Sequence, residues 1–201
     1  MAFIRSFVAV ELPEPVRAAL GRIQEGAKGT AGGAVKWASP GGIHLTLKFL
    51  GNVDEEKVPQ LVQALTGACE GSGTFELALS KLGVFPGPTR PRVAWVGLSG
   101  GVPELLRLQE RVEKALSPFG FPREERAFTP HLTLARVREY VSVEEARAFG
   151  EGFLKATPEA VSFRVEGISL MRSQLAPSGA VYSVLAFIPL HAPCKDPPLG
   201  L

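Results

Sequence analysis

The sequence is poor in the residues that build metal sites and disulfides. Only two of its 201 residues are cysteines and only three are histidines. Cys69 and Cys194 show no Cys-x-x-Cys spacing and have no histidines nearby at metal-ligand intervals. Neither a redox pair nor a zinc site is indicated. We therefore expect a protein that works without a metal or another cofactor.

Long apolar runs and strong charge are also missing. No stretch approaches the length of a membrane span, and the first residues run directly into a strand pattern without the features of a signal peptide. The 22 basic and 20 acidic residues leave a net charge of +2, which argues against a protein that coats long nucleic acids. We expect a cytoplasmic protein without a membrane partner or an obligate protein partner. The low net charge does not exclude a local basic cleft.

The remaining pattern predicts one globular domain over residues 1–192 and a flexible proline-rich tail over residues 193–201. Helical spacing of apolar residues predicts helices over 13–27, from about 54, over 102–116 and over 142–155. Strand-like runs occupy residues 3–10, 35–38, 43–50, 74–82, 92–98, 128–137, 161–171 and 180–188. Residues 85–91, rich in proline and glycine, predict a long loop.

One tetrapeptide occurs twice, as His44-Leu45-Thr46-Leu47 and as His131-Leu132-Thr133-Leu134. In each half of the chain the tetrapeptide strand is followed by a helix and two more strands. This order indicates internal duplication, and we predict an α+β fold. It should consist of two similar lobes of mainly antiparallel sheet, with outer helices around a central cleft.

Alternation along a strand places the histidine and the threonine of each copy on one face and both leucines on the other. If the two lobes face each other, one cleft holds two imidazoles and two hydroxyls. Such a pair can act as base and acid on opposite sides of a phosphorus atom, while the threonines hold the non-bridging oxygens. Two rival interpretations remain. The histidines could bind a metal ion, or both tetrapeptides could be ordinary structural strands.

The motifs themselves resemble those of a known family. Residues 44–51, reading HLTLKFLG, and residues 128–136, reading FTPHLTLAR, are similar to the two signatures of the two-histidine phosphoesterases. The likeness is to their bacterial and archaeal 2′-5′ RNA ligase group, understood as RNA 2′,3′-cyclic phosphodiesterases. It extends over about residues 3–188.

The resemblance implies hydrolysis of 2′,3′-cyclic phosphates at RNA ends, including tRNA fragments, to 2′-phosphomonoesters. It implies His44 as the general acid, His131 as the general base, and Thr46 and Thr133 as phosphate-binding residues. The chain lacks a G-x-x-x-x-G-K-[ST] phosphate loop and a K-x-D-G adenylation motif. Ligation is therefore expected only as the reverse reaction, driven by the strained cyclic phosphate.

Several further side chains are candidates for substrate binding. Three basic side chains could offset phosphate charge. Arg126 lies before the second motif, at a position that resembles a family arginine, and Arg136 lies beside that motif. Lys48 is expected on the same strand face as Thr46. The other candidates are Arg90 and Arg92 beside the loop, and Phe7, Trp37, Phe85 and Tyr182 for base stacking. Each also has an ordinary interpretation, as a surface ion pair or as part of the core.

Two alternatives to the main function stay open. The first is a related cyclic phosphodiesterase that acts on a small nucleotide or on 2′-5′ oligonucleotides. The second is a non-catalytic protein that binds RNA ends. The third histidine, His191, has no motif around it and is expected to be a surface residue without function.

Overall fold

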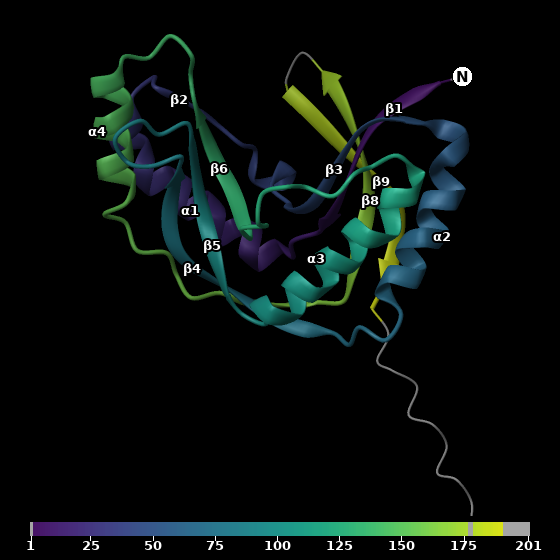
Figure 1. Cartoon of the computed structure of the whole chain (residues 1–201). Helices are drawn as coiled ribbons and strands as arrows, with labels where there is room; N and C mark the ends of the chain where they lie inside the picture. Colours follow the sequence, from purple (N-terminus) through teal and green to yellow (C-terminus); the bar gives the residue numbers. More distant parts are fainter. Residues whose placement is uncertain (1, 177–178, 191–201) are drawn as a thin grey trace, which may run out of the picture.

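The structure, a computed structural model, describes residues 2–176 and 179–190 (Figure 1). Its strands form two sheets in which all pairings are antiparallel. Sheet A has the order β3 (Leu45–Asp54), β1 (Phe3–Val10), β8 (Gly167–Ala176) and β9 (Gly179–Pro189). Sheet B has the order β2 (Val35–Trp37), β6 (His131–Val137), β5 (Val93–Gly100), β4 (Phe75–Phe85) and β7 (Ser162–Val165).

The helices lie on the outer sides of the two sheets (Figure 1). They are α1 (Glu14–Ala31), α2 (Val58–Cys69), α3 (Val102–Leu116) and α4 (Val143–Phe153). Helix α1 packs against α4 beside sheet B, whereas α2 and α3 pack against each other and against β9 and β3 of sheet A. The predicted α+β fold, with two antiparallel lobes and outer helices, is confirmed.

The hairpins are exchanged between the two halves of the chain. Hairpin β4–β5 follows the first tetrapeptide but pairs with β6, which carries the second tetrapeptide. Hairpin β8–β9 follows the second tetrapeptide but pairs with β1, the neighbour of β3. Each lobe therefore contains strands from both halves, and the two tetrapeptides are held in one interlocked body.

One predicted strand is wrong. The run over residues 161–171 is divided at Glu166 into β7, which pairs with β4 in sheet B, and β8, which belongs to sheet A. Both pieces alternate or remain apolar as strands do, so the local pattern continues through the point where the chain changes sheets. Only the pairing partners separate the two strands.

The helix boundaries differ from the prediction at glycine and proline residues. Helix α1 continues through Gly29 to Ala31, four residues beyond the predicted end. Helix α2 begins at Val58 after a 3-10 turn, which keeps Pro59 in the first helical turn where its missing N–H costs nothing. Helix α4 starts with the predicted capping box, in which Ser142 and Glu145 bond each other's backbone N–H groups.

The tetrapeptide leucines anchor both histidine segments in the core. Leu45, Leu47, Leu132 and Leu134 are at most 3 % exposed and belong to one buried apolar cluster that contains residues of both sheets. Complete burial of a leucine side chain contributes about 1.5–3 kcal/mol.

The predicted tail, with Cys194, and His191 lie outside the described residues.

Candidate active site

The two tetrapeptides face a common cleft between the sheets. His44 lies directly before β3 in sheet A, and His131 is the first residue of β6 in sheet B. A cavity of about 810 Å³ is lined by both histidines together with Thr46 and Thr133. The structure thus brings the four side chains together, each of them half-buried, while the neighbouring leucines point into the core.

The ring of His131 is oriented by the backbone. Its Nδ1 lies 2.8 Å from the carbonyl oxygen of Thr129, two residues earlier in the chain. In the neutral ring, Nδ1–H donates to this oxygen and Nε2 keeps a free lone pair. The edge-on rings of Phe85 and Trp95, with centroids 5.2 and 6.3 Å away, complete the surroundings. His131 therefore presents Nε2 as a proton acceptor.

The ring of His44 has a similar setting on the opposite sheet. It meets the rings of Phe7 and Tyr182 edge to face, with centroid distances of 5.7 and 5.0 Å. Burial lowers the pKa of His44 below its ordinary value, and the positive charge of Arg17 acts in the same direction. A hydrogen bond with the Gly42 backbone and the charge of Glu11 oppose this pKa shift without cancelling it.

Both tetrapeptides contain a β-bulge at their last leucine. In β3, Thr46 pairs with Ala9 and Lys48 pairs with Val8, so Leu47 has no partner on β1. In β6, Thr133 pairs with Trp95 and Ala135 pairs with Ala94, so Leu134 has no partner on β5. A bulge reverses the faces of the residues that follow it. It turns residues 48 and 135 away from the cleft, and residues 49 and 136 toward it.

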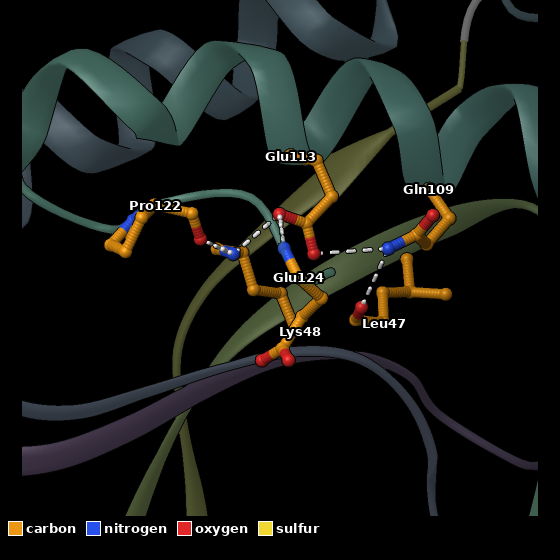
Figure 2. A network of polar contacts seen from close by, with 6 residues as sticks. All are labelled: Leu47, Lys48, Gln109, Glu113, Pro122 and Glu124. Atoms are coloured by element: carbon orange, nitrogen blue, oxygen red, sulfur yellow. Dashed lines mark hydrogen bonds and ion pairs between the residues drawn. The ribbon is translucent and has the colours of Figure 1, made fainter. Parts of the chain in front are cut away.

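The bulge corrects our expectation for Lys48. Instead of sharing the face of Thr46, this lysine points to the core side of sheet A, where its side chain is 2 % exposed (Figure 2). Its ammonium group contacts the Glu113 carboxylate at 2.5 Å and donates to the Pro122 carbonyl oxygen at 2.8 Å. The charge of Lys48 is therefore already paired within the protein, although the residue borders the cavity.

Three of the predicted arginines line the cleft, namely Arg92, Arg126 and Arg136. Over the described ranges, none of the three has an acidic partner within ion-pair distance. Their charges are therefore available to an anion in the cleft. Arg90 does not border this cavity.

The aromatic candidates divide between the cleft and the core. Trp37 packs against Phe149 at 6.1 Å and lines no cavity at the tetrapeptides, so the structure does not place it at the site. Phe7 borders a neighbouring cavity but is only 5 % exposed. Phe85 lines the cleft.

The predicted list lacks Phe49, which is 67 % exposed beside Thr46. Strand alternation without a bulge would place Phe49 on the face opposite Thr46, so the sequence gives no sign that this ring lines the cleft.

Two further findings concern metals and membranes. In the part of the chain that the structure describes, no three side chains of the metal-binding types gather into a group that could hold an ion. Among the same residues no helix is long and apolar enough to cross a membrane.

The sequence matches the family model described as "2′-5′ RNA ligase superfamily" over residues 12–176. A Methanothermobacter thermautotrophicus protein named RNA 2′,3′-cyclic phosphodiesterase is 36 % identical over 182 residues, which are 90 % of this chain and 95 % of that protein. A Thermotoga maritima protein of the same name is 32 % identical, with coverage of 90 % and 93 %.

Solved structures agree with this result. A Thermus thermophilus protein aligns with a TM-score of 0.75 and 31 % identity, over 93 % of this chain and 98 % of that chain. Escherichia coli LigT complexed with 3′-AMP aligns with a TM-score of 0.74 and 27 % identity, over 94 % and 99 % of the two chains.

Proposed function

The chain belongs to the 2′-5′ RNA ligase superfamily, and on this basis we propose that it is an RNA 2′,3′-cyclic phosphodiesterase that uses His44 and His131 as acid and base. The observation that carries the proposal is the shared cleft, in which two histidines and two threonines from opposite sheets line one cavity. Two imidazoles and two hydroxyls are sufficient for an in-line displacement at phosphorus without a metal ion.

The reaction begins at His131. Its Nε2 removes a proton from a water molecule, and the water oxygen forms a bond to the phosphorus of the cyclic phosphate. The bond between phosphorus and O3′ breaks on the opposite side, and His44 gives a proton to O3′. The product is an RNA end with a 2′-phosphate and a free 3′-hydroxyl. The hydrogen bond from Nδ1–H of His131 to Thr129 supports this role, because it leaves Nε2 free to accept.

The acid role of His44 depends on the substrate. Burial lowers the pKa of this ring and so favours its neutral form, which cannot give a proton to O3′. A bound cyclic phosphate is an anion and favours the imidazolium form. Substrate binding thus supplies the protonation state that the acid needs.

The remaining cleft residues hold the phosphate. The hydroxyls of Thr46 and Thr133 donate hydrogen bonds to the two non-bridging oxygens, where negative charge is concentrated in the transition state. Arg136 and Arg126, which have no acidic partner in the described residues, stabilise the same charge. Arg92 binds the RNA strand at the rim of the cleft.

Ligation uses the same displacement at phosphorus with a different nucleophile. An RNA 5′-hydroxyl-terminated strand replaces water as the nucleophile, and the strain of the five-membered cyclic phosphate drives the formation of a 2′-5′ bond. No nucleotide triphosphate is consumed. RNA ends with a cyclic phosphate, including tRNA fragments, are the proposed substrates.

The test is hydrolysis of an oligonucleotide with a 2′,3′-cyclic phosphate end in the presence of EDTA. We expect activity in the wild type and a decrease in kcat/KM of about 10²- to 10⁴-fold in His44→Ala and in His131→Ala. His191→Ala serves as the matched control, because this third histidine belongs to neither motif. Full activity of either cleft variant would overturn the two-histidine mechanism, and loss of wild-type activity in EDTA would overturn metal independence.

A further inference from the structure

A second cavity of about 400 Å³ adjoins the active-site cleft. The two cavities share His44, Thr46, Phe49, Thr133 and Arg136, so the reacting groups and the Phe49 ring lie at their boundary. Beyond this boundary the second cavity is lined by residues of sheet A, among them Arg5, Phe7 and Ser173. Space for a ligand therefore continues past the phosphate position, on the side away from Phe85 and Arg92.

An exposed aromatic ring lies where the second cavity meets the cleft. Phe49 is 67 % exposed, and the bulge at Leu47 is what turns it to this face. Its direct partner on β1 is Phe7, whose ring lies 6.2 Å away and is 5 % exposed. The buried ring of Phe7 supports Phe49 from one side and leaves the remaining surface of Phe49 open. An exposed aromatic ring on a rigid strand is a platform on which a nucleobase can stack.

A cationic side chain, that of Arg5, lies in the second cavity beside the Phe49 ring. Arg5 is exposed and lies two residues before Phe7 on the same face of β1. No acidic side chain in the described residues is within ion-pair distance of Arg5. The cyclic phosphate is already served by Arg136 and the threonines at the boundary. An additional unpaired guanidinium in the adjoining cavity is therefore suited to a second anion.

We propose that this second cavity binds the nucleotide that precedes the cyclic phosphate end, with its base on Phe49 and its phosphodiester group at Arg5. The proposal rests on the proposed function and adds a preference to it. A mononucleotide 2′,3′-cyclic phosphate carries one phosphate and one base, and leaves this site empty. An RNA strand fills it. The site thus selects RNA ends over small cyclic nucleotides.

The experiment compares two substrates, adenosine 2′,3′-cyclic phosphate and the dinucleotide ApA with a 2′,3′-cyclic phosphate end. The measured quantity is the ratio of kcat/KM for the dinucleotide to kcat/KM for the mononucleotide. We expect this ratio to decrease about tenfold or more in Phe49→Leu, through a higher KM, because leucine keeps the apolar bulk but removes the ring. Phe49→Tyr should restore the ratio.

Phe3→Leu is the matched control, because Phe3 is 64 % exposed on the same sheet but lines neither cavity. In Arg5→Gln the dependence of log KM on log salt concentration for the dinucleotide should decrease by about 0.7, the amount for one lost phosphate contact with a single strand. Arg5→Lys should retain the slope.

The outcomes separate the two proposals. An unchanged ratio in Phe49→Leu would overturn the second nucleotide site, and so would a decrease of equal size for both substrates. A selective loss for the mononucleotide would also overturn it, since the cavity would then hold the terminal nucleoside. If the wild type hydrolyses neither substrate, the proposed function itself fails. Titration of the dinucleotide 2′-phosphate product then still tests the site, and equal affinity of wild type and Phe49→Leu overturns it.

Discussion

Lys48 and Glu113 form an ion pair of 2.5 Å whose side chains are 2 % and 5 % exposed (Figure 2). The same carboxylate accepts hydrogen bonds from the side-chain amide of Gln109 at 3.1 Å and from the backbone N–H of Glu124 at 3.3 Å. The network therefore connects β3, just after the first tetrapeptide, with α3 and with the connector that leads to the second tetrapeptide. Its charges are satisfied inside the protein.

Removing one partner of this pair should destabilise the fold. Lys48→Met leaves the Glu113 carboxylate buried without its counter-charge, and we expect the free energy of unfolding to decrease by about 3–5 kcal/mol. The double variant Lys48→Met/Glu113→Leu removes both charges and should lose less than the sum of the two single variants. Chemical denaturation followed by circular dichroism measures the unfolding free energies of Lys48→Met, Glu113→Leu and the double variant. Additive losses would show that the two side chains do not depend on each other.

The threonine hydroxyls should contribute to the chemical step more than to folding. Thr46→Val and Thr133→Val keep the shape of the side chain but remove the donor, and we expect kcat to decrease by roughly 10²- to 10³-fold in each. Thr46→Ser and Thr133→Ser retain the hydroxyl and should keep most of the activity. An unchanged kcat in the valine variants would remove the threonines from the transition state.

The pKa of His44 should respond to its two charged neighbours in opposite directions. Burial remains the main cause of the lowered pKa in every variant. Arg17→Met removes a positive charge and should raise the pKa of His44, whereas Glu11→Gln removes a negative charge and should lower it further. Titration of the imidazole signals by NMR in the free protein measures both shifts. A shift of the same sign in the two variants would contradict this account.

The pH dependence of kcat/KM should shift in the same directions as the pKa of His44. A general acid is active below its pKa, so the activity that depends on protonated His44 is lost as the pH rises through that value. Arg17→Met should therefore move the alkaline limb of kcat/KM to higher pH. The two limbs report macroscopic values of the coupled histidine pair, and a profile without an acid limb and an alkaline limb would count against acid and base catalysis.

Gly83 should be required for the packing of the Trp95 and Phe85 rings against His131. A Cβ atom at this position would come within 2.1 Å of the Trp95 indole, which stacks on Phe85 at 4.9 Å. Gly83→Ala must displace the indole, and we expect a loss of about 1–3 kcal/mol in unfolding free energy together with lower activity. Gly26→Ala is the control, because this helical position has no atom within 4 Å and alanine there should stabilise by about 0.4–1 kcal/mol. Equal effects of the two variants would contradict the packing argument.

The sequence by itself determined which residues are central to the site and the class of fold. The repeated His-Leu-Thr-Leu identified four residues that line one cleft, and alternation correctly assigned the leucines to the core and the other two side chains to the cleft. Helix α3 and the capping box of α4 were also predictable, because apolar spacing and capping are local properties. Such features depend on neighbours within a few residues along the chain.

Only the tertiary structure decided what surrounds the four residues. Alternation predicts Lys48 beside Thr46, but the bulge at Leu47 buries Lys48 and exposes Phe49, and the equivalent bulge at Leu134 turns Arg136 into the cleft. The strand over residues 161–171 likewise looked continuous until its partners separated it into two sheets. Alternation is a property of one strand, whereas a bulge or a change of sheet is set by pairing with strands far away in the chain. The proposed catalytic residues can therefore be identified from local sequence, whereas the shape and charge of the cleft around them depend on long-range strand register.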